Sequence, residues 1–150
     1  MVSRAAIDDF LAQEALAVVG VSTSGRKFGN SAFEVLKKSG RRVFIVNPKA
    51  KEIGGEPSYP SLQELPEKVG GVVVVVPPAQ TEGLVRQVKA AGIERVWMQP
   101  GAESELAISF CQENGISVIS HECVMMHAEP VRGFHRFHRG VRKVLGRMPR

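Results

Sequence analysis

The sequence predicts a doubly wound α/β fold, in which helices cover both faces of a parallel sheet. Short apolar runs alternate with helical patterns along most of the 150 residues, as they do in strand–helix–strand units. One run, Val72–Val76, consists of five consecutive valines. A strand with no polar alternation is typical of a parallel sheet that is buried on both faces.

Five parallel strands are expected, and the crossover rules give them an order in the sheet. The apolar runs that predict them are residues 16–21, 42–46, 72–76, 95–98 and 116–119. With right-handed crossovers, we expect the order 3-2-1-4-5.

Helices are expected to precede the first strand and to connect the others. Their patterns cover residues 3–14, 31–39, 82–91 and 103–114, with a short helical turn from Ser61. Ser3 or Asp8 is expected to cap the first helix and Thr81 the third, because a hydroxyl or carboxylate accepts from the free N–H groups of a first turn. The spacing of Ser61 and Glu64 has the form of a capping box.

Length and composition favour one domain in the cytoplasm. No apolar run approaches the 18 or more residues of a membrane-spanning helix. The N-terminus has early acids and no signal-peptide core. The two cysteines, Cys111 and Cys123, are too few for a disulfide framework, so both are expected to be reduced thiols.

The net charge of +5 is concentrated in the last residues of the chain. Residues 132–150 hold seven of the 20 Lys/Arg and no acid. We therefore divide the chain into a body, 1–128, and a basic C-terminal extension, 129–150. Apolar residues recur at helical spacing in the extension, which favours a helix packed on the body or in a homodimer. A patch for nucleic acid or anionic lipid, and a disordered tail, are the alternatives.

Ligands of such sheets bind beyond the carboxyl ends of the strands. After the first strand comes a loop of glycines, hydroxyls and cations that leads into a helix, an arrangement that receives phosphate on a helix N-terminus. The candidate binding residues there are Gly20, Ser22, Thr23, Ser24, Arg26, Lys27 and Asn30. The G-x-G-x-x-G pattern of dinucleotide-binding proteins is absent.

The second strand is followed by Asn47, Pro48 and Lys49. An NAD site would place an acid here for the ribose hydroxyls, so a cation indicates a ligand with an additional phosphate. After the valine strand, Val76, Pro77 and Pro78 offer a stiff apolar ledge for a flat base. Further candidates follow the fourth strand at Gln99 and Gly101.

No catalytic set is evident, and no metal site is expected. The stretch His121-Glu122-Cys123 suggests a metal or a Cys-His nucleophile, but neighbouring residues of an extended segment point to opposite sides. A polar loop at a strand end is the favoured interpretation.

Several segments together resemble a known family, in order and over about residues 6–125. They are Ala17–Ser22, Val46–Lys49, Tyr59–Leu62, Val72–Pro78 and Val96–Gly101. They resemble the stand-alone CoA-binding domain family, which is similar to the N-terminal domain of the succinyl-CoA synthetase α subunit. The resemblance implies a Rossmann-like fold with coenzyme A at the carboxyl edge of the sheet, among the candidate residues named above. Cys123 matches a cysteine common in that family, either as a plain thiol or as the partner of the CoA thiol in a mixed disulfide.

The expected function is therefore non-catalytic binding of coenzyme A or an acyl-CoA. The second domain with a phosphorylated histidine and the β subunit of the synthetase have no counterpart in this sequence. An NAD(P)-dependent oxidoreductase or an acyl-CoA ligase subunit is the enzyme alternative. A nucleic-acid-binding or scaffold protein that acts through the basic extension is the third.

Overall fold

The structure is a computed structural model that describes residues 3–25 and 27–128. The candidate ligand residue Arg26 and the predicted basic extension, 129–150, lie outside the described residues.

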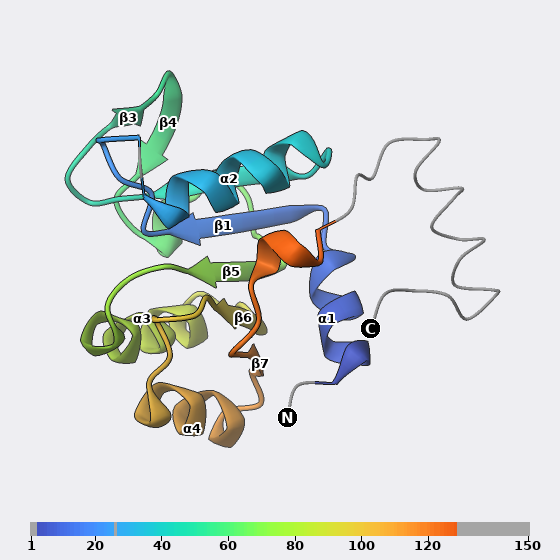
Figure 1. Cartoon of the computed structure of the whole chain (residues 1–150). Helices are drawn as coiled ribbons and strands as arrows, with labels where there is room; N and C mark the ends of the chain where they lie inside the picture. Colours follow the sequence, from blue (N-terminus) through green and yellow to red (C-terminus); the bar gives the residue numbers. More distant parts are fainter. Residues whose placement is uncertain (1–2, 26, 129–150) are drawn as a thin grey trace, which may run out of the picture.

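The fold is an α/β domain built on one sheet, as predicted (Figure 1). The sheet has seven strands in the order β3-β4-β2-β1-β5-β6-β7. All neighbours pair in parallel except β3 and β4, which are antiparallel. The strands are β1 (Ala15–Val19), β2 (Arg42–Val46), β3 (Glu52–Ile53), β4 (Glu56–Tyr59), β5 (Gly71–Val74), β6 (Arg95–Met98) and β7 (Ser117–Ile119).

The predicted count of five strands and the place of the valine strand are wrong. The missed strand β4 lies beside β2, where the prediction put the valine strand, and the valine strand β5 lies on the other side of β1. If the parallel strands alone are numbered along the chain, leaving out β3, their order in the sheet is 3-2-1-4-5-6.

The strand β4 escaped prediction because it contains Pro57 and follows Gly54-Gly55. These glycines have φ of +59° and +83° and form the tight turn between β3 and β4.

In the part of the chain that the structure describes, four helices and two 3₁₀ turns accompany the sheet, and Figure 1 shows helices on both of its faces. They are α1 (Arg4–Leu11), α2 (Phe28–Lys38), η1 (Leu62–Glu64), α3 (Pro78–Ala90), α4 (Glu105–Glu113) and η2 (Val124–Met126). Buried side chains of α1, α2 and η2 form one cluster with one face of the sheet. Those of α3, α4 and η1 form a second cluster with the other face.

The helix ends confirm one predicted cap and contradict two. Ser3 accepts from the backbone N–H of Ala6 at 3.1 Å and caps α1. Thr81 does not cap α3, because that helix already begins at Pro78, and Thr81 instead donates its hydroxyl to the carbonyl oxygen of Ala102 at 2.8 Å. Ser61 caps no backbone group, and its hydroxyl lies 3.3 Å from the Glu64 carboxylate.

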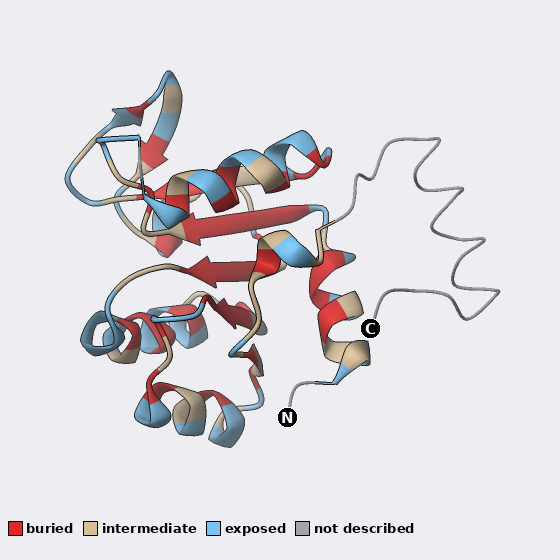
Figure 2. Cartoon of the chain, viewed as in Figure 1, coloured by how far each residue is buried: buried red, intermediate tan, exposed pale blue. Residues whose placement is uncertain are grey.

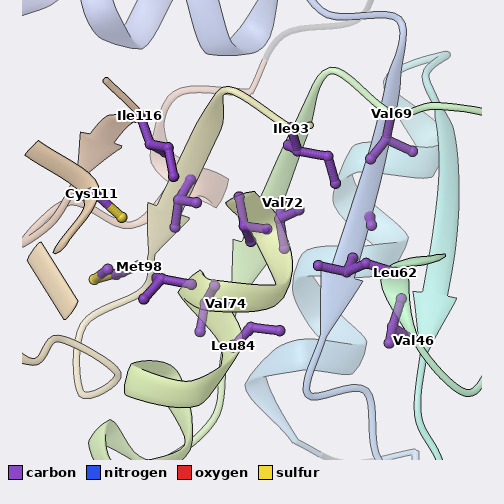
Figure 3. Packing of buried hydrophobic residues seen from close by; sticks show 14 of the residues in the cluster. Val46, Leu62, Val69, Val72, Val74, Leu84, Ile93, Met98, Cys111 and Ile116 are labelled. Carbon is purple, nitrogen blue, oxygen red and sulfur yellow. The ribbon is translucent and has the colours of Figure 1, made fainter. Parts of the chain in front are cut away.

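The sheet is buried on both faces, as the run of valines predicted (Figure 2). Val72 and Val74 pack in the α3/α4 cluster (Figure 3), whereas Val73 packs in the α1/α2 cluster. Trp97 of β6 is fully buried, and its ring meets that of Phe10 edge to face at 5.3 Å. No helix among residues 3–25 and 27–128 is long and apolar enough to cross a membrane.

Candidate functional site

The parallel strands place five loops along one edge of the sheet, at their carboxyl ends. In chain order they are loop one (20–27), loop two (47–51), loop three (75–77), loop four (99–104) and loop five (120–123). This edge is where ligands of open α/β sheets bind, and the predicted site residues that the structure describes, all but Arg26, lie on it or in the adjoining first turn of a helix.

Glycines let loop one pass close to its neighbours. Gly20 has φ of +121°, and a Cβ at this position would lie 2.2 Å from the carbonyl oxygen of Val75. A Cβ on Gly29, in the first turn of α2, would lie 2.3 Å from the carbonyl oxygen of Gly20. Both positions therefore require glycine, and α2 begins directly against the end of β1.

The Asn30 side chain holds loop one in shape. Its Oδ1 accepts from the backbone N–H of Ser22 at 2.9 Å and of Lys27 at 3.3 Å, and its Nδ2 donates to the carbonyl oxygen of Ser22 at 2.9 Å. Both ends of the amide are thus engaged within the loop. Thr23 and Lys27 are exposed beside it.

Asn47 joins loop two to loop one. Its Nδ2 donates to the carbonyl oxygen of Val21 at 2.9 Å, and its Oδ1 accepts from the backbone N–H of Lys49 at 2.8 Å. The second bond turns the chain back at Pro48 and leaves the side chain of Lys49 exposed. The structure thus brings two of the predicted binding segments together.

A hollow of about 580 Å³ adjoins loop one. Loop one, α2, β2 and the β3–β4 turn border it, and because β3 and β4 were not predicted, the hollow could not be predicted either. None of the predicted residues of loops two, three and four borders it. The lining residues are Val21, Thr23, Ser24, Gly25, Asn30, Ser31, Phe33, Glu34, Val35, Ile45, Ile53, Gly54 and Glu56.

Loop three leads directly into α3. Val76 is half-buried, and Pro77 and Pro78 are exposed. Pro78 is the first residue of the helix, where the missing N–H of proline costs no hydrogen bond. The two prolines therefore start α3, and they lie exposed at the place where a ledge for a base is predicted.

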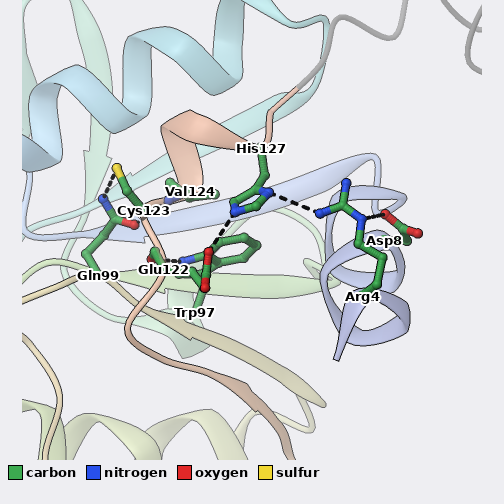
Figure 4. Close-up of polar contacts among 8 residues, drawn as sticks. All are labelled: Arg4, Asp8, Trp97, Gln99, Glu122, Cys123, Val124 and His127. Carbon is green, nitrogen blue, oxygen red and sulfur yellow. Dashed lines mark hydrogen bonds and ion pairs between the residues drawn. The ribbon is translucent and has the colours of Figure 1, made fainter. Parts of the chain in front are cut away.

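In loop four, Gln99 faces loop five with its side chain, away from solvent (Figure 4). It is 2% exposed, its Oε1 accepts from the backbone N–H of Val124 at 2.6 Å, and its Nε2 lies 3.5 Å from the Sγ of Cys123. Gly101 has φ of +97° and is exposed. Gln99 thus fixes the position of half-buried Cys123.

Loop five is also held by Trp97, His127 and Arg4, none of which was predicted as a site residue (Figure 4). The indole N–H of Trp97 donates to the carbonyl oxygen of Glu122 at 2.7 Å. His127 lies between two charged groups, with its Nε2 2.8 Å from the Glu122 carboxylate and its Nδ1 3.2 Å from the Arg4 guanidinium. These contacts join residues far apart in sequence, and no local pattern could have revealed them.

Neither His121 nor Cys123 belongs to a cluster of metal-ligand type among residues 3–25 and 27–128. In the part of the chain that the structure describes, no three His, Cys, Asp or Glu side chains are grouped as metal ligands. The side chain of His121 is 73% exposed.

The fold and the glycine-lined edge define a nucleotide-binding type of α/β domain. The chain belongs to the CoA binding domain family, whose sequence profile matches residues 14–129. This confirms the resemblance drawn from the sequence. The match covers the whole sheet and all five loops, but it does not test the individual ligand residues, which stay predictions.

Known proteins similar to the chain include free-standing domains and parts of larger enzymes. A conserved hypothetical protein from Pyrococcus furiosus is 36% identical, with a TM-score of 0.71 over 75% of this chain and 97% of that one. The acetate–CoA ligase (ADP-forming) I of Archaeoglobus fulgidus is 29% identical over 74% of this chain, and the α subunit of ligase II of Pyrococcus furiosus is 25% identical over 79%. The chain spans only 18% and 28% of the lengths of these two ligases.

Proposed function

We propose that the protein binds coenzyme A or an acyl-CoA at the carboxyl edge of its sheet and performs no reaction of its own there. One observation carries the proposal, namely the hydrogen bond of 2.9 Å from Asn47 to the carbonyl oxygen of Val21. It joins loops one and two, so that Lys27, Lys49 and the N-terminus of α2 lie at the same end of the edge. Membership of the CoA binding domain family supports the same ligand.

Recognition of the nucleotide end depends on charge. Free N–H groups at the start of α2 and the cation of Lys27 favour the diphosphate. Lys49 takes the 3′-phosphate, where an NAD-binding protein would carry an acid for the ribose hydroxyls. The base packs on Val76, Pro77 and Pro78. The pantetheine arm then runs along the edge toward loops four and five.

Calorimetric titration with coenzyme A, acetyl-CoA, dephospho-CoA, NAD and NADP tests the proposal. We expect the two CoA ligands to bind most tightly, dephospho-CoA less tightly because it lacks the 3′-phosphate, and NAD least tightly. NADP is the closest competitor, because Lys49 could also accept its 2′-phosphate. Binding of NAD or NADP at least as tight as that of coenzyme A would overturn the proposal.

The ligase relatives favour a second candidate, in which the chain presents coenzyme A to a separate catalytic partner. The observation behind it is that the chain matches a limited part of two acetate–CoA ligases. Incubation of the purified chain with acetate, ATP and coenzyme A separates catalysis from binding. We expect no acetyl-CoA from the chain alone, and its formation would contradict the non-catalytic proposal.

A further inference from the structure

Glu103 of loop four holds loops four and five together with a single carboxylate. Its Oε1 accepts from the backbone N–H of Gly101 at 2.8 Å, and its Oε2 accepts from the backbone N–H of His121 at 3.2 Å. The side chain is 17% exposed. A carboxylate is thus fixed in place by one N–H group from each loop.

The backbone of both loops is shaped to make these contacts. Gly101 has φ of +97°, and His121, with φ of +63°, is the one non-glycine residue with positive φ among residues 3–25 and 27–128. A positive φ is unfavourable for a residue with a side chain. The hydrogen bond that the N–H of His121 donates to the Glu103 carboxylate helps to offset this cost, so we expect the carboxylate to stay in place.

The charge of Glu103 is opposed by two backbone N–H groups and one imidazole, and by no stronger base among the described residues. The nearest basic group is the Nδ1 of exposed His121, at 3.4 Å, and no Lys or Arg lies within ion-pair distance in the part of the chain that the structure describes. Glu122 adds a second carboxylate in loop five, 2.8 Å from His127. Loops four and five are therefore negative, whereas Lys27 and Lys49 make loops one and two positive.

We propose that Glu103 determines which CoA ligands the site accepts. The inference rests on the proposed function, in which the thiol end of coenzyme A reaches loops four and five. A free thiol or a neutral acyl group can lie beside a carboxylate, whereas an acyl group that ends in a second carboxylate is repelled. The repulsion is stronger than between fully solvated ions, because Glu103 is largely removed from water. The ligands are therefore coenzyme A and neutral acyl-CoA, and dicarboxylic acyl-CoA is excluded.

The affinity ratio of butyryl-CoA to succinyl-CoA tests this, since both acyl groups have four carbons and only the second is charged. For the unaltered protein, we expect butyryl-CoA to bind at least about tenfold more tightly than succinyl-CoA. Glu103→Gln keeps the size of the side chain but removes the charge, and should bring the ratio to within about threefold.

Glu105→Gln is the matched control. Glu105 lies two residues further on, at the exposed start of α4, and its removal should leave the ratio unchanged. Adenosine 3′,5′-bisphosphate, which lacks the pantetheine arm, should bind Glu103→Gln and the unaltered protein equally. A loss of bisphosphate affinity in Glu103→Gln would assign Glu103 a general structural role and overturn the proposal.

A measurement on the unaltered protein covers the case in which Glu103→Gln does not fold. β-Alanyl-CoA carries a cationic acyl group and should bind at least as tightly as butyryl-CoA, with succinyl-CoA the weakest. Equal affinities for the three, with coenzyme A itself bound, would overturn the role of Glu103 and leave the proposed function standing. If neither coenzyme A nor the bisphosphate binds, the proposed function is wrong, and this inference is wrong with it.

Discussion

The two ends of the carboxyl edge are built in opposite ways. At loops one and two, the side chains of Thr23, Lys27 and Lys49 are exposed, and two asparagines hold the backbone beneath them. At loops four and five, Gln99 and Val124 are buried and bond to each other across 25 residues of sequence. One end presents charge to solvent, whereas at the other end the side chains that hold the loops are themselves buried.

This difference matches what the two ends of a CoA ligand require. Phosphates are bound by exposed cations and by N–H groups that already point outward before binding. A thiol or a short acyl group offers little charge of its own, so discrimination there requires protein groups, the Glu103 carboxylate included, that are held in fixed positions. Substitutions at the fixed end should therefore mainly change stability, whereas substitutions of the exposed cations at the open end should mainly change ligand affinity.

Removal of the Trp97 side chain should have the largest effect. The indole is fully buried, contacts the rings of Phe10 and His127, and donates to the carbonyl oxygen of Glu122. Trp97→Ala should lower the free energy of unfolding by about 3–5 kcal/mol, measured by urea denaturation.

Trp97→Phe is the control for this prediction, because it keeps most of the apolar contact and removes only the N–H donor. It should cost clearly less than Trp97→Ala, while leaving the Glu122 carbonyl oxygen without its partner. Equal losses for the two variants would mean that loop five depends on the hydrogen bond and not on packing.

At the open end, Gly29→Ala should destabilise the protein although alanine favours helices. A Cβ on Gly29 would lie 2.3 Å from the Gly20 carbonyl oxygen, so α2 must shift away from loop one, at a cost of about 2–3 kcal/mol. Gly83→Ala in α3 is the matched control, since nothing lies within 4 Å of its added Cβ. It should stabilise the protein by up to about 1 kcal/mol. Thermal denaturation of both variants measures the contrast, and a neutral Gly29→Ala would contradict the close approach.

The contrast between the two ends also explains what the sequence could predict. Loop one was predicted because its glycines, hydroxyls and cations are neighbours in sequence, and residue type alone indicates a phosphate-binding turn. The parallel sheet followed from the valines of β5. Membership of the family confirms the class of protein that these segments suggested.

The fixed end could not be predicted, because its contacts join residues that no local pattern relates. Gln99 stays a predicted ligand residue, but nothing in the sequence indicated that its amide bonds Val124 and contacts Cys123. Local rules also failed where two of them competed. Thr81 has the side chain of a cap, but Pro78 is better suited to begin the helix and does so.

The charge of the open end is tested by Lys49→Ala. If Lys49 bonds the 3′-phosphate, its loss should weaken binding of coenzyme A by about 1.5–3 kcal/mol, measured by calorimetry. Dephospho-CoA should bind the variant and the unaltered protein equally. Lys51→Ala, two residues further along and equally exposed, is the control and should have a smaller effect. An unchanged affinity for coenzyme A in Lys49→Ala would mean that this cation contacts only water.

The smallest expected effect is a pH dependence of stability caused by Cys111 of α4, whose thiol is buried in the core, unlike that of half-buried Cys123. Burial raises the pKa of the Cys111 thiol from 9.0 to about 11. The unfolded chain therefore loses this proton at lower pH than the folded protein does. The stability that the neutral thiol contributes is complete below pH 9 and is lost as the pH rises toward 11.

Between about pH 8 and pH 10, the loss should amount to about 1 kcal/mol. Cys111→Ala removes the thiol, so the difference in unfolding free energy between this variant and the unaltered protein should shrink by that amount over the same range. Val88→Ala, in the same buried cluster but with nothing to titrate, should show a difference that does not change with pH. Urea denaturation at the two pH values measures both. If the Cys111→Ala difference stayed constant, the thiol would be ionising in the folded protein as readily as in the unfolded chain. Cys111 would then be open to solvent, and the contrast between a closed core and the half-buried Cys123 of the edge would be lost.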